Sequence, residues 1–197
     1  GGLGDVYKRQ GFTFRLMVYS IVCSQAIKNN TEKFKIFKKD LNIHDSIDIN
    51  QNISSDEKDF LRIALRVLKK YNCVPNEGYD IEIKSEIPIN SGLSSSSALI
   101  VAWVNFLLTT FSDKSISPRL LADLSYEIEV KEMNGSGGNM DQYTIAYGRT
   151  IFLDTIRNEI DTYDHNLCDM IIGVSNKPKD INERIGAKPV VCYPNNN

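Results

Sequence analysis

A run of small hydroxyl residues stands where a helix is expected to begin. Gly92 and Leu93 precede four serines, Ser94 to Ser97, and the apolar segment 98–104 follows them. The strand-like segment 79–84 comes before the run. The first N–H groups of a helix lack intrahelical partners and the helix dipole is positive there, so this position suits an anion. Small side chains let a phosphate approach the backbone, and serine hydroxyls add donors or a metal ligand. The run therefore predicts binding of a nucleoside triphosphate.

The same serines have a simpler explanation. Serine-rich stretches are commonly flexible linkers, and serine caps helices without any ligand. The pattern is also not a Walker A loop, because no lysine follows Gly92 before Lys114. The preceding strand, the lead-in from Pro88 and the apolar helix that follows favour the phosphate-binding interpretation over these alternatives.

A second group of residues that could do chemistry spans positions 129–142. It contains Glu129, a glycine-rich turn and the triplet Met140-Asp141-Gln142. A carboxylate is a ligand that Mg²⁺ prefers, and an aspartate can accept a proton from a hydroxyl. Both residues have alternative interpretations. Glu129 could be a solvated acid on an amphipathic helix, as we expect for Glu127 and Glu132, and Asp141 could be only the N-cap of the next helix.

These two segments resemble known motifs. Residues 88–98 resemble the ATP-binding motif of the GHMP kinases. Residues 129–142 resemble the segment in which galactokinases carry a glutamate, a glycine-rich turn and Met-Asp-Gln. A weaker third match, residues 174–180, is similar to a Pro-Lys-Asp segment of sugar-kinase-like members. The resemblance covers the region from about residue 79 to about residue 180.

The resemblance implies a set of site residues and two cofactors, ATP and Mg²⁺. Ser96 and Glu129 would bind the metal, and Asp141 would take the proton of the acceptor hydroxyl. Gly137 and Gly138, with Asp141, would contact the substrate. The residues expected to bind ATP are Gly92, Leu93, Ser94, Ser95, Ser96 and Ser97. Ser97 departs from the family, in which alanine is commoner at this position.

The implied function is transfer of the γ-phosphate of ATP to a sugar hydroxyl, as in galactokinases. Two alternatives stay open. One is a GHMP kinase for another acceptor, such as a heptose phosphate, fucose or mevalonate. The other is a galactokinase-like sensor that binds the same ligands without catalysis. The sequence does not name the sugar or the oligomeric state.

The expected fold is α+β. The resemblance implies a mixed β-sheet with helices on one face and a left-handed βαβ crossover, over residues 11–160, followed by the start of a C-terminal α/β domain at 161–197. Residues 1–10 resemble a translated sequencing adapter, and we set them aside. We expect a fragment cut at both ends, with weak or no activity of its own.

Composition excludes some function classes. A net charge of −2 over 197 residues gives no electrostatic reason to expect nucleic acid. The lysines in segment 33–39 alternate with apolar residues, which predicts an edge strand with a solvated face. The apolar segment 99–111 is shorter than the roughly 18 residues of a membrane span. The four cysteines form no Cys-x-x-Cys pair, which favours free thiols and a cytoplasmic location.

Local signals predict the boundaries of several elements. The segment 54–57 is a plausible capping box that opens an amphipathic helix. Ser117 and Pro118 are expected at the start of a helix over 118–133, and a short helix over 140–147 is expected to end at Gly148. Alternating or β-branched residues predict further strands, at 17–27, 33–37, 43–49, 79–87, 151–153 and 169–174.

Overall fold

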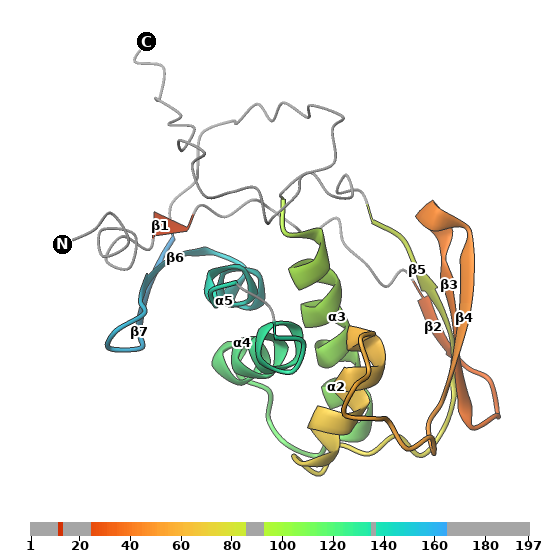
Figure 1. Cartoon of the computed structure of the whole chain (residues 1–197). Helices are drawn as coiled ribbons and strands as arrows, with labels where there is room; N and C mark the ends of the chain where they lie inside the picture. The colour runs from red at the N-terminus through yellow and green to blue at the C-terminus, as the bar shows by residue number, and fades with distance from the viewer. Residues whose placement is uncertain (1–11, 14–24, 86–92, 135–136, 165–197) are drawn as a thin grey trace.

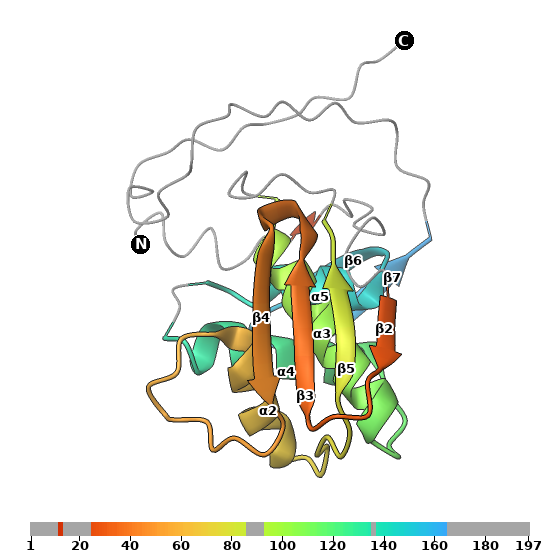
Figure 2. The same cartoon turned by 90° about the vertical axis from the view of Figure 1, so that its right-hand side faces the viewer.

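The computed structural model of the chain describes residues 12–13, 25–85, 93–134 and 137–164 (Figure 1). Within this part, strands and helices form an α+β arrangement with helices gathered on one face of the larger sheet (Figure 2). Gly92 and the predicted elements at 169–174 and 174–180 lie outside the described residues, as does most of the predicted strand 17–27. The domain boundaries assigned from the sequence stay predictions.

The larger sheet is formed by strands whose side chains alternate between a buried and an exposed face. In β3, Phe34 and Ile36 are buried while Lys33 and Lys35 are exposed. The strand order is β2-β5-β3-β4, in which β3 runs parallel to β5 and the other neighbours are antiparallel. The strands are β2 (Gln25–Lys28), β3 (Lys33–Lys38), β4 (Ile43–Asp48) and β5 (Tyr79–Ile83).

The mixed sheet confirms the expected fold class, but the predicted edge position of segment 33–39 is wrong. Strand β3 is flanked by β4 and β5, so its backbone groups are paired on both sides. The alternating lysines indicate that one face of the strand is exposed to solvent. They do not indicate that the strand lies at the edge of the sheet, because side chains alternate across a strand at any position in the sheet. Figure 2 shows that face turned toward the viewer, with the helices behind it.

Among the described residues, four α-helices pack behind the larger sheet and toward a second sheet. They are α2 (Phe60–Lys69), α3 (Ser95–Phe111), α4 (Pro118–Tyr126) and α5 (Met140–Tyr147). The second sheet has the order β1-β6-β7 and is formed by β1 (Phe12–Thr13), β6 (Thr150–Asp154) and β7 (Glu159–Tyr163). Figure 1 shows α4 and α5 between α3 and the second sheet. In the described part of the chain, no helix is both long and apolar enough to cross a bilayer.

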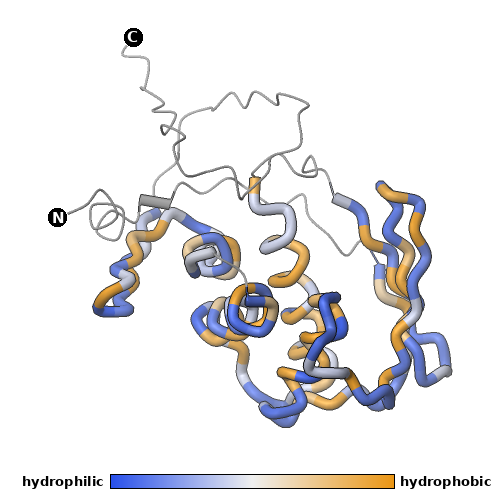
Figure 3. Tube along the Cα trace, viewed as in Figure 1, coloured by the Kyte–Doolittle hydropathy of each residue, from blue (hydrophilic) through white to orange (hydrophobic). Residues whose placement is uncertain are grey.

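The main core lies between the larger sheet and helices α2 and α3. Helix α3 is apolar on most of its surface, which suits a helix enclosed by neighbours, and Figure 3 shows this. Trp103 is 3% exposed, packs edge-on against Phe34 and donates its indole N–H to the Leu61 carbonyl at 3.0 Å. A smaller buried cluster joins α4 and α5 to β6 through residues such as Tyr143 and Ile151.

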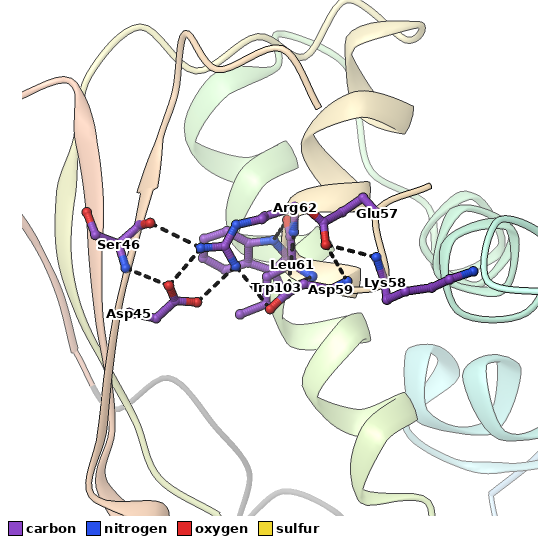
Figure 4. Close-up of polar contacts among 8 residues, drawn as sticks. All are labelled: Asp45, Ser46, Glu57, Lys58, Asp59, Leu61, Arg62 and Trp103. Carbon is purple, nitrogen blue, oxygen red and sulfur yellow. Dashed lines mark hydrogen bonds and ion pairs between the residues drawn. The ribbon is translucent and has the colours of Figure 1, made fainter. Parts of the chain in front are cut away.

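An ion pair fastens α2 to strand β4 (Figure 4). Arg62 donates to both carboxylate oxygens of Asp45, at 2.7 and 3.0 Å, and to the Ser46 carbonyl at 3.1 Å. The hydrogen bond from Arg62 lowers the pKa of Asp45 below its ordinary value. Asp59 caps the same helix by accepting from the backbone N–H groups of Leu61 and Arg62.

The predicted capping box at 54–57 is therefore wrong as the start of α2. Ser54 and Glu57 accept backbone hydrogen bonds in the preceding loop, and the helix begins at Phe60. Residues 54–57 include types that favour an N-cap, as does Asp59. Only Asp59 directly precedes Phe60, the first residue of α2. The Ser117–Pro118 start and the Gly148 end are confirmed, since Ser117 caps α4 and Gly148 adopts the left-handed conformation after α5.

Candidate active site

The serine run forms the first turn of α3, where the sequence predicts it. The first α-helical bond runs from the Ala98 N–H to the Ser94 carbonyl at 3.0 Å. The backbone N–H groups of Ser95, Ser96 and Ser97 therefore precede the intrahelical ladder. Ser94 occupies the N-cap but makes no capping hydrogen bond with its side chain. This end of α3 is a place where backbone donors and the positive end of the dipole are available to an anion.

The backbone at the start of α3 is constrained. Ser94 has φ 57° and ψ 37°, which is the left-handed region. A residue with a Cβ adopts this conformation at a cost of about 1–2 kcal/mol. Strained backbone of this kind clusters at ligand-binding sites, so its position at the serine run supports a functional interpretation.

Glu129 lies on a π-helical segment that follows α4 directly. The predicted helix over 118–133 is confirmed as a continuous helical segment, but it is an α-helix only to Tyr126 and continues as a π-helix (Glu127–Lys131). The Glu132 N–H donates to the Glu127 carbonyl at 2.9 Å, which is the i to i+5 bond of a π-turn. Such a turn inserts an extra residue and re-aims the side chains that follow it, and π-turns are frequent at functional sites.

Both ends of the π-helix are held by α2 and the turn that follows it. Tyr71 donates to the Glu127 carboxylate at 3.2 Å, and Arg66 and Lys70 pair with Glu132 at 2.7 and 3.4 Å. Burial, and then the Glu127 carboxylate, raise the pKa of Tyr71. The expectation that Glu127 and Glu132 are merely solvated acids is therefore wrong. These contacts fix the segment that carries Glu129.

Three elements that are distant in the sequence meet at the Glu129 carboxylate. Ser97 on α3 donates its hydroxyl to Oε1 at 3.1 Å, and Gln142 on α5 donates its amide to Oε2 at 2.6 Å. The Gln142 amide also lies 3.5 Å from the Ser97 hydroxyl oxygen. Ser97 and Gln142 are 3% and 2% exposed, whereas Glu129 is half-buried. The carboxylate is therefore held at both oxygens by buried side chains, while Glu129 as a residue is partly exposed.

Asp141 stands next to Gln142 in the first turn of α5. Asn139 occupies the N-cap of that helix and makes no capping hydrogen bond, so the alternative role of Asp141 as the N-cap is wrong. Asp141 is half-buried, and Gly137 and Gly138 just before it are exposed. A Cβ at Gly138 would meet no atom within 4 Å, and one at Gly137 would meet only Val130 at 3.7 Å. The fold itself therefore does not require glycine at these two positions.

The last two serines of the run, Ser96 and Ser97, differ in a way that the sequence did not predict. Ser96 is exposed, so its hydroxyl can reach a ligand that arrives from solvent. Ser97 is buried against Glu129, and Gln142 joins it there although the sequence assigned Gln142 no role of its own. The Met-Asp-Gln triplet was the signal that could have found it. The predicted ligand roles of Leu93 and of Ser94 to Ser97 stay predictions.

The site is separate from an open groove on the other side of the larger sheet. That groove measures about 450 Å³ and is lined by side chains of β2, β3, β4 and β5, including the stacked rings of Phe37 and His44. Because the helices cover the opposite face, the groove contains none of the predicted site residues. It takes no part in the arrangement around Glu129.

Comparison with known proteins agrees with this geometry. The family described as the GHMP kinases N terminal domain matches residues 59–149. The mevalonate kinase of Methanocaldococcus jannaschii is 33% identical over 107 residues, covering 54% of this chain and 34% of that protein. A Glaesserella parasuis galactokinase is 29% identical over 125 residues, covering 62% and 32%. The D-glycero-alpha-D-manno-heptose 7-phosphate kinase of Campylobacter jejuni is 28% identical over 134 residues, covering 59% and 37%.

Solved structures share the fold. The crystal structure of Lactococcus lactis galactokinase in complex with galactose superposes with a TM-score of 0.61 at 23% identity, covering 73% of this chain and 39% of that one. The chain spans about a third of the length of the curated relatives described above. The matched segment includes Ser97, Glu129 and Gln142, which hydrogen bonds join in the structure, as well as the other serines of the run and Asp141. The chain therefore carries a GHMP kinase N-terminal domain.

Proposed function

We propose that this domain binds ATP with Mg²⁺ and forms the nucleotide-binding part of a kinase that phosphorylates a hydroxyl of a small molecule, with a sugar as the favoured acceptor. The observation that carries the proposal is the meeting of three elements. The start of α3, the π-helix and the first turn of α5 place Ser97, Glu129 and Gln142 within hydrogen-bond distance of one another. Ser96 and Asp141 are the sequence neighbours of these residues.

The start of α3 is suited to hold phosphate groups. Phosphoryl transfer depends on positioning and on neutralising phosphate charge more than on covalent catalysis. The N–H groups of Ser95, Ser96 and Ser97 would donate to phosphate oxygens, aided by the helix dipole. The Ser96 hydroxyl is exposed beside them. These groups would fix the nucleotide without any large rearrangement of α3, which is anchored in the core by Trp103.

The residues present fit a magnesium ion. The ligands proposed for the ion are oxygens, namely the Glu129 carboxylate and the Ser96 hydroxyl, and Mg²⁺ takes oxygen ligands. Among the described residues, no cluster of three or more His, Cys, Asp or Glu side chains could hold a metal by itself. This agrees with the way Mg²⁺ binds in kinases, through one or two carboxylates together with substrate phosphates and water. The ion, when bound, would neutralise phosphate charge.

Asp141 would orient the acceptor hydroxyl and accept its proton. Its place in the first turn of α5, beside the exposed Gly137 and Gly138, lets an acceptor approach both the carboxylate and the backbone. A sugar is favoured because the triplet at 140–142 resembles that of galactokinases. A second candidate acceptor is mevalonate, which the 33% identity to a mevalonate kinase supports. The need for ATP and the buried free thiol of Cys73 agree with a cytoplasmic location.

The test is acceptor-dependent release of ADP by the complete gene product. The panel contains galactose, fucose, a heptose 7-phosphate, mevalonate and homoserine, each with Mg-ATP. We expect release with one acceptor, and loss of that release in Asp141→Asn with Mg-ATP binding retained. Full turnover by Asp141→Asn would refute the proton-accepting role. Binding of ATP and a sugar without release of ADP would instead support a non-catalytic sensor.

A further inference from the structure

Glu129 is held at both of its carboxylate oxygens by neutral donors. Ser97 donates to Oε1 and Gln142 donates to Oε2, from two different helices. A carboxylate that accepts at only one oxygen can swing about that bond, whereas two donors on separate helices fix the plane of the group. An ionised carboxylate has about four acceptor positions, so two of these remain for a further ligand.

Neither donor is itself able to reach a ligand from solvent. Ser97 and Gln142 are almost completely buried, and Glu129 is the half-buried member of the group. Their effect on a bound group therefore passes through the Glu129 carboxylate. Partners of this kind, which orient a metal ligand without touching the metal, typically change metal affinity by about 10–100-fold when they are replaced.

The Gln142 amide is placed in a way that packing alone does not explain. Its Oε1 is buried without a hydrogen-bond partner among the described residues. A buried acceptor without a partner costs about 1–3 kcal/mol, so an apolar side chain of similar size would be the more stable choice for packing. The reverse orientation of the amide would set Oε1 against a carboxylate oxygen. The donor is therefore directed at Glu129.

The hydroxyl of Ser97 is the second unusual feature. In the family that the serine run resembles, alanine is commoner at this position, and alanine provides no donor. Here the hydroxyl lies between the Gln142 amide, at 3.5 Å, and the Glu129 carboxylate, at 3.1 Å. The hydroxyl that alanine would lack therefore forms a hydrogen bond with Glu129, the proposed metal ligand.

We propose that Ser97 and Gln142 are positioning residues that fix the Glu129 carboxylate for magnesium, an inference that rests on the function proposed above. They act through Glu129 and contact neither the ion nor the nucleotide with their side chains. Loss of either donor lets the carboxylate rotate, so the affinity for Mg²⁺ falls while the contacts of the nucleotide with the α3 backbone remain.

The experiment measures ATP binding by calorimetry across a Mg²⁺ titration, with a parallel series in EDTA. The variants are Ser97→Ala, Gln142→Leu and Glu129→Gln. A matched control is Ser125→Ala, which removes a buried hydroxyl that donates to the Leu121 carbonyl at 2.7 Å on α4. We expect Gln142→Leu to raise the half-saturating Mg²⁺ concentration about tenfold or more, and Ser97→Ala to raise it less, because its hydrogen bond is longer. Binding in EDTA stays unchanged in both.

The outcomes separate the inference from the function on which it rests. If Glu129→Gln weakens the Mg²⁺-dependent part of binding while Ser97→Ala and Gln142→Leu match Ser125→Ala, the positioning role is wrong and the metal-ligand role of Glu129 stands. If Glu129→Gln leaves the Mg²⁺ dependence intact, the metal-ligand role itself fails. Equal losses with Mg²⁺ and in EDTA mean that the two residues only support the local packing, which overturns the inference.

Discussion

Removal of the Arg62 guanidinium is expected to destabilise the chain in a way that depends on pH. Arg62→Met deletes two bonds to the Asp45 carboxylate, one to the Asp59 carboxylate and one to the Ser46 carbonyl. Hydrogen bonds to charged groups contribute roughly 1.5–3 kcal/mol each, but these share one guanidinium. The two side chains of the pair are also 19% and 22% exposed, so solvent screens part of the interaction. We therefore expect a total loss of about 2–3 kcal/mol at pH 7.

The sign of the pH dependence follows from Asp45. The hydrogen bond from Arg62 lowers the pKa of Asp45 in the folded state. The ion pair therefore stabilises the fold fully above the unfolded pKa of about 3.9, and this contribution disappears as the pH falls through the lower folded value. The difference between wild type and Arg62→Met should shrink to below about 1 kcal/mol once Asp45 is protonated.

The assay is urea unfolding followed by the fluorescence of Trp103, the single tryptophan of the chain, at pH 7 and at pH 2.5. Trp103 donates to the Leu61 carbonyl next to Arg62, so it reports on this part of the core. Lys39→Met is the matched control. It removes an ion pair with Glu82 in which the side chains are 54% and 37% exposed, and it should cost less than about 0.5 kcal/mol at either pH. An equal loss for Arg62→Met at both pH values would refute the argument.

Three further predictions concern the candidate site and the core. Gly138→Ala should leave the unfolding midpoint unchanged, because the added Cβ meets open space. If an acceptor packs against Gly138, the variant should lower kcat/KM about tenfold or more. Unchanged kinetics would contradict the substrate role of Gly138. Ser94→Val should destabilise the chain by about 1–2 kcal/mol in the same urea assay, whereas Ser94→Gly should change stability by less than about 0.5 kcal/mol, because relief of the left-handed strain offsets the entropy of glycine. Burial raises the pKa of the Cys73 thiol to about 11, so iodoacetamide at pH 8 should modify Cys73 only after unfolding, as read by peptide mass spectrometry.

Signals confined to a few residues were sufficient for several helix ends. Ser117 followed by Pro118, the small residues before the apolar run of α3, and Gly148 after α5 all act within one turn of the helix they bound. The capping prediction at 54–57 is wrong because it relied only on residue types that favour an N-cap. Several residues there favour an N-cap, and the structure shows that the helix uses Asp59, whose carboxylate accepts from the backbone N–H groups of Leu61 and Arg62.

Features that depend on contacts between distant segments were beyond the sequence. The interior position of β3 is decided by its pairing with β5, more than 40 residues later in the chain. The π-turn at 127–131 has no local pattern that separates it from a continuing α-helix. It is held by Arg66 on α2 and by Tyr71 in the turn after that helix. The assignment of Ser96 and Glu129 to one site came from family resemblance, and the buried role of Ser97 became visible only from the packing of α3 against α5.

The helix caps show how this fold separates stability from ligand binding. Helices α2 and α4 are capped by their own side chains, Asp59 and Ser117, which satisfy backbone donors at their starts. At the starts of α3 and α5, Ser94 and Asn139 provide no capping hydrogen bond. A side-chain cap contributes about 1 kcal/mol, so the chain gives up stability at these two ends. They are the two helix starts that converge on Glu129. The backbone N–H groups that lack a capping side chain are thus those that a phosphate or an acceptor would bind in the proposed function. The stability lost at these helix starts is therefore explained by ligand binding.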